Sequence, residues 1–255
     1  MIELFGVQIA LDTRLVVLLI AVTVGGIVRG FTGFGSALII IPALTLVFNP
    51  LHAVVMHSVM EVPVILSLAP TAIKHANRRV ALPMILALLI TTPIGAIVLS
   101  SIDVNSLKLM IAFAVLGMVC LLAIQRQISA MIGPRGTIAA SGLGGLIQGA
   151  VGIGGPPIVT ALMARGDQPD TSRGNVIAVM SSVIAVSLVS FGALGLITKE
   201  VLVIGALVSP VCLLATLAGM YAFGKFGAAH HRLVTLVVLA LTALETLVVV
   251  SMSSG

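Results

Sequence analysis

Residues 29–36 read RGFTGFGS, and residues 149–157 read GAVGIGGPP. The first stretch separates the apolar residues 15–28 from the apolar residues 37–48, and the second follows the apolar residues 137–151 and precedes a short apolar tail. At a rise of about 1.5 Å per residue, each apolar piece is too short to cross roughly 30 Å of hydrocarbon as a single helix. We therefore expect each region to form two half-helices around a glycine break.

The two breaks match when the sequence is shifted by 119 residues. Five glycines of the first region then fall on five of the second, namely Gly25, Gly26, Gly30, Gly33 and Gly35 on Gly144, Gly145, Gly149, Gly152 and Gly154. The pair Asn49-Pro50 falls on Gln168-Pro169 in the same register. The pattern predicts an internal duplication, with one repeat over 1–130 and the other over 131–255, together forming a single membrane domain.

The composition indicates a protein that is solvated by lipid. Of 255 residues, 59% are hydrophobic and only 8% are charged, and the mean hydropathy is +1.27. These values exclude a disordered chain and a soluble globule, which could not cover its surface with so few charges. Six apolar runs are long enough to be transmembrane helices: 53–73, 80–99, 106–125, 174–197, 201–224 and 233–252.

The distribution of basic residues predicts the topology. Lys and Arg gather in the loops 74–79, 125–136 and 224–232, which the positive-inside rule places in the cytoplasm. An even number of crossings must then separate the last two loops, which favours a re-entrant hairpin at each break over a single broken pass. We expect an all-α integral membrane protein of about eight membrane elements, with two inverted repeats that each contain one hairpin and three helices. Both termini then lie outside the cytoplasm.

Several other classes of function find no support in the sequence. Residues 1–14 lack the apolar core of a signal peptide, so we expect the first hydrophobic segment to be retained. No enzyme motif or metal-ligand spacing occurs, Cys120 and Cys212 lie in apolar runs, and the adjacent pair His230-His231 suits a basic loop. We therefore expect no catalytic residue, metal or cofactor, and no nucleic-acid partner, because no basic cluster with interleaved aromatic residues is present.

The glycine breaks predict an anion site. A helix that begins after such a break presents unpaired N–H groups and the positive end of its dipole. We expect such starts at Ser36 and Gly155, with Gly33, Gly35, Gly152 and Gly154 lining the substrate path. Gly26-x-x-x-Gly30 and Gly145-x-x-x-Gly149 have the spacing of close helix packing instead.

Only three charged residues, Arg29, Glu61 and Glu245, lie at membrane depth. Ionisable residues at this depth are functional candidates. Arg29, which corresponds to Gln148 in the second repeat, could bind an oxyanion. Glu61 lies one turn after His57, so the two are candidates for proton coupling, although Glu61 could equally neutralise Arg29. Asn175 is a further candidate for substrate binding, whereas the charged loop 164–173 reads as a solvated interface.

The motif Gly30-x-x-Gly33-x-Gly35 and its repeat Gly149-x-x-Gly152-x-Gly154-Gly155-Pro156 resemble the signature of the TauE/SafE sulfite exporter family. The resemblance implies a bacterial inner-membrane transporter of sulfite or of C2/C3 organosulfonates such as sulfoacetate, so the outer side that the charges predict for both termini is the periplasm. Interrupted helices in inverted repeats are typical of secondary transporters that work by alternating access. Proton or cation coupling and a homodimer both stay open. The alternatives are an anion channel of the same architecture and a membrane scaffold subunit that transports nothing.

Overall fold

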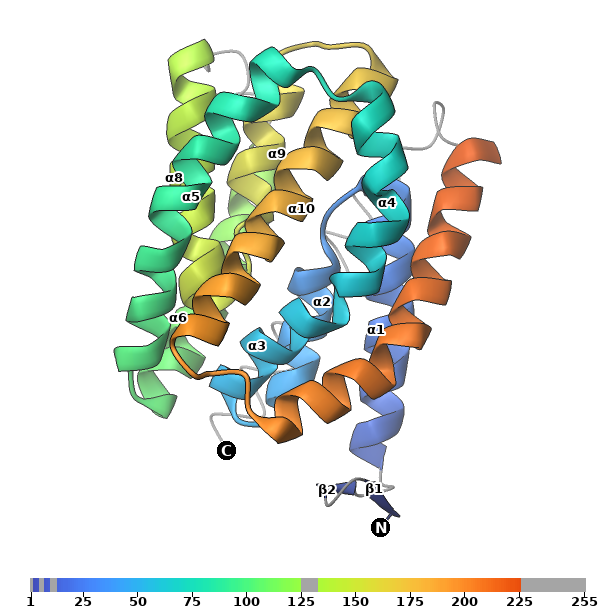
Figure 1. Ribbon diagram of the computed structural model, residues 1–255, viewed down its shortest axis with the longest axis vertical. Coiled ribbons are helices and arrows are strands. Elements are labelled where there is room, and N and C mark those ends of the chain that lie inside the picture. Colours follow the sequence, from blue (N-terminus) through green and yellow to red (C-terminus); the bar gives the residue numbers. More distant parts are fainter. Residues whose placement is uncertain (1, 5–6, 10–12, 125–132, 226–255) are drawn as a thin grey trace.

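The computed structural model describes residues 2–4, 7–9, 13–124 and 133–225 (Figure 1). Within these ranges the chain is helical apart from an antiparallel hairpin of β1 (Ile2–Leu4) and β2 (Val7–Ile9), which the expectation of an all-α protein did not include. The labelled helices are α1 (Thr13–Thr32), α2 (Ser36–Thr45), α3 (Pro50–Met60), α4 (Val62–His75), α5 (Arg78–Ser101), α6 (Val104–Ala123), α8 (Pro134–Val151), α9 (Gly155–Met163) and α10 (Pro169–Ala193). A further helix covers Lys199–Lys225. The predicted span 233–252, with Glu245 and the nearby His230-His231, lies outside the described residues.

The described helices are those of a multi-pass membrane protein. Three of them are long and apolar enough to cross a membrane, over Arg78–Ser101, Asp170–Ala193 and Lys199–Lys225. They confirm the runs 80–99, 174–197 and 201–224, although α10 ends earlier than predicted, at Ala193. The helix α6 covers most of the predicted run 106–125.

The run 53–73 is not one straight helix. It is divided into α3 and α4, which meet at Glu61 with a bend of 44° and are long and apolar enough to cross a membrane only when taken together. Pro63 lies in the first turn of α4. Proline has no N–H to donate and its ring crowds the carbonyl four residues earlier, here that of Val59, so the regular helix stops at this point.

The first break is shorter than the sequence suggested. The helix α1 has 20 residues and includes Arg29 and Gly30, so the interruption is confined to residues 33–35. Gly33 and Gly35 have φ angles of 86° and 95°, a conformation that residues with a Cβ rarely adopt. The predicted half-helix 15–28 was therefore too short, because Gly30 is accommodated inside the helix.

Each break reverses the chain. The helix α2 folds back on α1, so that a Cβ added to Gly25 would lie 2.7 Å from the Ile40 side chain. The helix α9 folds back on α8 in the same way, and a Cβ added to Gly144 would lie 2.6 Å from Ile158. The two broken regions are thus helical hairpins with a short second arm.

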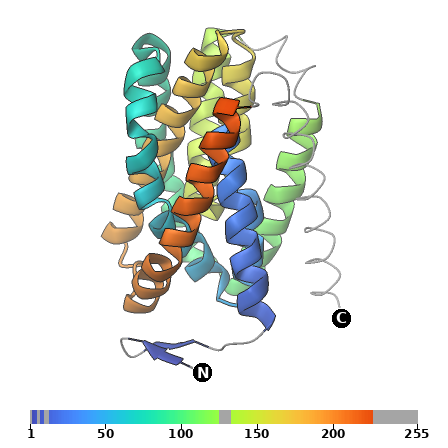
Figure 2. The same cartoon turned by 90° about the vertical axis from the view of Figure 1, so that its right-hand side faces the viewer.

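Glycines allow α1 and α8 to pack closely against long helices elsewhere in the chain. A Cβ at Gly30 would overlap the carbonyl oxygen of Thr216 in the helix Lys199–Lys225, which runs alongside α1 in both views (Figures 1 and 2). A Cβ at Gly149 would overlap the carbonyl oxygen of Thr92 in α5. The predicted packing role of the Gly26-x-x-x-Gly30 and Gly145-x-x-x-Gly149 pairs is confirmed.

The same contacts recur in the opposite direction. A Cβ at Gly219 would overlap the Ile27 carbonyl oxygen of α1, and a Cβ at Gly95 would overlap the Leu146 carbonyl oxygen of α8. Ile27 and Leu146 are again 119 residues apart. Each hairpin therefore packs against a long helix from the other half of the chain.

The loops are sorted between the two ends of the molecule. At one end, the Asn77 N–H between α4 and α5 donates to Asn175 Oδ1 of α10 at 2.7 Å. At the other end, His52 Nδ1 near the start of α3 lies 3.9 Å from Glu200 Oε2. The helix α1 enters the bundle from the end where β1 and β2 lie, and α8 enters from the opposite end (Figure 1).

The short helices form the centre of the bundle. Nearly all the residues of α2, α3 and α9 are buried, which is expected of helices that are apolar on every side. The longer helices α4 and α5 expose large apolar side chains, such as Leu66 and Ile90, each 69% exposed. These surfaces suit contact with lipid, so the half-helices and their glycine breaks are enclosed at the centre.

Candidate functional site

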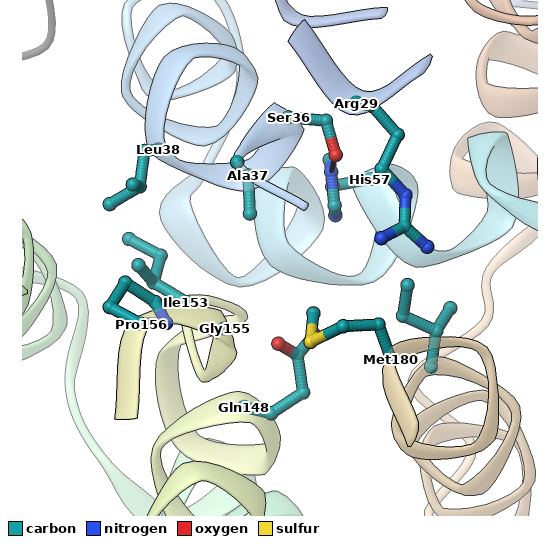
Figure 3. Close-up of a pocket in the computed structure, with 12 residues that line it drawn as sticks. Arg29, Ser36, Ala37, Leu38, His57, Gln148, Ile153, Gly155, Pro156 and Met180 are labelled. Carbon is teal, nitrogen blue, oxygen red and sulfur yellow. Dashed lines mark hydrogen bonds between the residues drawn. The ribbon is translucent and has the colours of Figure 1, made fainter. Parts of the chain in front are cut away.

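The two glycine breaks meet at one buried pocket. Residues from the end of α1 and the start of α2 line one side of it, and residues from the end of α8 and the start of α9 line the other (Figure 3). The helices α3 and α10 close the remaining sides. The lining consists of Arg29, Gly35, Ser36, Ala37, Leu38, His57, Gln148, Ile153, Gly155, Pro156, Met180 and Ile184.

The pocket is small. A water-sized sphere can place its centre in only about 20 Å³. One water needs roughly 10–15 Å³ on this measure, so there is room for about one water molecule. An oxyanion with three or more heavy atoms would fit only if the two breaks moved apart.

Arg29 is the charged group at the centre of the site. Its side chain is 1% exposed, and its Nε lies 3.1 Å from Glu61 Oε2. Its Nη1 donates to the Gly33 carbonyl oxygen and so stabilises the backbone of the first break. Its Nη2 is buried and has no hydrogen-bond partner among the described residues. A buried guanidinium with an unused N–H can donate a hydrogen bond to an oxygen of an anion.

Ser36 and His57 complete a network around Glu61. The Ser36 hydroxyl donates to Glu61 Oε1 at 2.6 Å and lies 3.3 Å from His57 Nε2. His57 Nε2 lies 3.7 Å from the same Glu61 oxygen, and its Nδ1 is buried without a hydrogen-bond partner in the described chain. Glu61 therefore pairs with Arg29, which was one of the two alternatives drawn from the sequence, and also lies beside His57.

Gln148 occupies the place in the second hairpin that Arg29 occupies in the first. Its side chain is 2% exposed and lines the pocket. Its Oε1 accepts a hydrogen bond from the Gly154 N–H at 2.9 Å, just as Arg29 binds the backbone of its own break. Arg29 and Gln148 thus each stabilise the backbone of a glycine break and also line the pocket.

The predicted helix starts are confirmed, but they are not equivalent. The helix α2 begins at Ser36 and α9 begins at Gly155, and both residues line the pocket. Pro156 and Pro157 lack N–H groups, so Gly155 alone supplies one among the first three residues of α9. Hydrogen-bond donors are therefore concentrated on the side of the pocket formed by α1 and α2, whereas α9 contributes mainly backbone atoms that line the pocket.

Three of the glycines predicted to line the substrate path pack against other parts of the chain in this structure. Gly33 packs against Val176 of α10, and Gly152, with a φ angle of 77°, packs against Ile41 of α2. A Cβ at Gly154 would overlap the Gly144 carbonyl oxygen. None of the three belongs to the pocket lining as the structure describes it.

Two polar residues of α10 lie away from the pocket. Asn175 is buried, with its Oδ1 bonded to Asn77 N and its Nδ2 3.3 Å from Asp167 Oδ2, so its amide joins two loops. Arg173 belongs to the first turns of α10 rather than to a solvated loop. Its Nη2 donates to the Gly30 carbonyl oxygen at 2.9 Å, and its guanidinium carbon lies 4.3 Å from the centre of the Phe223 ring.

The sequence did not single out the apolar part of the lining. Met180 and Ile184 are four residues apart in α10 and so share one face, yet many apolar pairs in this chain have that spacing. Leu38 follows the first break and Ile153 lies inside the second, and this position in the sequence was the only available signal for them. Apolar side chains carry little information about which cavity they face.

The fold and the pocket define a multi-pass helical membrane protein with interrupted helices around a buried polar site, an arrangement typical of secondary transporters. The chain belongs to the sulfite exporter TauE/SafE family, whose model matches residues 17–246. This match confirms the resemblance carried by the two glycine motifs. No curated protein and no solved structure matches the chain.

Proposed function

We propose that the protein is a secondary transporter of a small oxyanion, sulfite or a C2/C3 organosulfonate such as sulfoacetate. The observation that carries this proposal is the buried Nη2 donor of Arg29, which lacks a partner in the described chain and belongs to a pocket between two helix starts. A guanidinium pairs well with the oxygens of a sulfonate or sulfite. The N–H groups at the start of α2 are the neighbouring donors, and the Ser36 hydroxyl joins them once it no longer donates to Glu61.

The proposed mechanism is alternating access around the two hairpins. We infer that residues 1–130 and 131–255 are inverted repeats of one transport domain, with three further helices in each repeat. The reciprocal glycine contacts, Gly30 with Thr216 and Gly149 with Thr92, support this assignment, because each hairpin uses the same surface against the other half. Moving one hairpin with its partner helix would open the pocket to one side at a time.

A proton accompanies the anion in this proposal. The charges of Arg29 and Glu61 cancel, so an incoming anion would leave a net negative charge in the membrane interior. One proton bound by Glu61 or His57 restores the balance for a monovalent anion such as hydrogen sulfite, and protons on both residues do so for the dianion sulfoacetate. Protonation of Glu61 also weakens its hold on Arg29, which frees the guanidinium for the anion.

The protein is proposed to lie in a bacterial inner membrane with both termini in the periplasm. Lys74, Arg78 and Arg79 cluster at the end of the bundle that also holds Arg165, which supports a cytoplasmic position for that end. The opposite end carries the His52–Glu200 pair and the start of α1.

Flux measurements in proteoliposomes test the function. We expect sulfite or sulfoacetate to enter with saturable kinetics, and the same anion outside to accelerate efflux of a labelled anion inside. Flux that rises in proportion to concentration without exchange would favour the channel. Absence of both binding and flux for sulfite, sulfoacetate and related sulfonates, in protein that is correctly inserted, would favour the scaffold.

A further inference from the structure

A second, open groove lies on the flank of the bundle, away from the central pocket. It runs between α4 and α5 with α10 as its floor, and a water-sized sphere can place its centre in about 370 Å³ of it. This is more than ten times the value of the central pocket. Its lining consists of Ala69, Ala72, Ile73, Ala76, Arg78, Ala81, Leu82, Ile85, Ala178, Ser181 and Ser182.

The groove is apolar along its length and basic at one end. Alanines on all three helices keep it open, and the Ser182 hydroxyl on its floor already donates to the Ala178 carbonyl oxygen at 2.8 Å. Arg78 carries the only charge among the described residues that line it. From Arg78 to Ile85 the groove follows α5 for about 10 Å.

The surroundings of the groove place it in contact with lipid. Ile73 and Leu82 on its rim are 79% and 58% exposed, and apolar side chains continue along the outer faces of α4 and α5. Arg78 is the first residue of α5, so the positive end of that helix dipole lies beside it. Lys74 and Arg79 lie near the same end of the two helices.

We infer that this groove binds an anionic phospholipid, with one acyl chain between α4 and α5 and the phosphate on Arg78. Basic pockets between membrane helices on the cytoplasmic side bind anionic headgroups through this combination of charge and apolar depth. A second copy of the chain fits less well. A two-fold axis along the membrane normal through this flank would bring two Arg78 side chains to the same level, where they repel each other.

Binding of phosphatidylglycerol to the purified, delipidated protein tests the inference. We expect phosphatidylglycerol to raise the melting temperature of the protein and phosphatidylcholine to raise it less. Arg78→Gln should weaken phosphatidylglycerol binding roughly fivefold, whereas Arg79→Gln, which removes the adjacent charge outside the groove, should change it little. Equal effects of the two substitutions would overturn the proposal.

A second variant tests the acyl chain independently of the headgroup. Ala72→Leu narrows the groove and should remove the motionally restricted signal of spin-labelled phosphatidylglycerol while Arg78 is intact. Stabilisation by inorganic phosphate equal to that by the lipid would overturn the proposal in favour of a simple anion site. Conversion of a dimer to a monomer by Ala72→Leu would overturn it in favour of a second copy.

Discussion

Arg29 Nε lies 3.1 Å from Glu61 Oε2, and neither side chain is more than 1% exposed. The pair joins the end of α1, next to the first glycine break, to the junction where α3 bends into α4. A buried ion pair stabilises a fold only weakly, but removal of one partner leaves the other charge unpaired, which costs about 3–5 kcal/mol. The ion pair thus links the pocket to the bend between α3 and α4.

Arg29→Gln should abolish anion transport and also destabilise the protein, because Glu61 then keeps a buried charge without a counter-ion. Arg29→Gln combined with Glu61→Gln should restore the melting temperature close to that of the unchanged protein. Transport should stay at least tenfold reduced, since the guanidinium is still missing. Thermal unfolding in detergent and uptake by proteoliposomes measure the two effects.

The double variant separates the two roles of Arg29. If the pair were structural only, restoring its neutrality would restore flux as well as stability. Recovery of sulfite or sulfoacetate flux in the double variant would therefore contradict a direct contact between Arg29 and the anion.

Gly155→Ala should reduce transport without unfolding the protein. A Cβ at this position would lie 3.3 Å from Met180 Cε, the end of a flexible side chain, so the backbone can stay in place while the pocket becomes smaller. The matched control is Gly117→Ala in α6, where nothing lies within 4 Å of the added carbon. We expect anion flux to fall several-fold in Gly155→Ala only. Equal flux in the two variants would contradict a role of Gly155 in the transport pocket.

Gly30→Ala and Gly149→Ala should each lower the melting temperature. In both cases the added Cβ would overlap a backbone carbonyl oxygen of a neighbouring long helix, so the helices must separate. Overpacking of this kind costs about 1–3 kcal/mol, and the similar contacts predict similar losses at the two positions. A large loss at one position and none at the other, measured by thermal unfolding, would contradict the proposed equivalence of the two hairpins.

Features governed by local chemistry were predictable from the sequence. Glycines mark the two breaks, and Pro156 with Pro157 marks the start of α9, because these residues restrict the backbone wherever they occur. The shift of 119 residues also identified Gly30 and Gly149 as equivalent packing positions, and their contacts agree with it.

Features that depend on distant partners were not predictable in the same way. The sequence suggested that Arg29 belongs to the break, but Arg29 lies inside α1. The helix continues through Gly30 because this glycine packs against Thr216, which is distant in the sequence. Asn175 looked like a substrate ligand, but its amide is occupied by Asn77 and Asp167 from separate loops. A polar residue in an apolar helix indicates a buried interaction without identifying its partner.

Single cysteines placed at the two ends of the bundle should be labelled from opposite sides of the membrane. In a background without Cys120 and Cys212, Lys74→Cys and Arg165→Cys should react only with reagent on the cytoplasmic side. Lys199→Cys and Asn105→Cys should react only from the periplasm, because the structure places them at the other end. All four native residues are exposed, so labelling should not require unfolding. Labelling of Lys74→Cys and Arg165→Cys from different sides would contradict the hairpin topology.

Replacing Glu61 by Gln should uncouple the proton from the anion. The groups that face Glu61 are Arg29, Ser36 and His57. Ethanesulfonate, a monovalent C2 sulfonate, suits this test, because it stays ionised where sulfite itself titrates. In the unchanged protein, ethanesulfonate uptake should acidify the vesicle interior and slow as the external pH rises. Glu61→Gln leaves the site with the permanent charge of Arg29, so uptake should become independent of pH and should move no protons. Acidification that persists in this variant would contradict the prediction and assign the proton to His57. The variant His57→Asn would then confirm that assignment by abolishing the acidification.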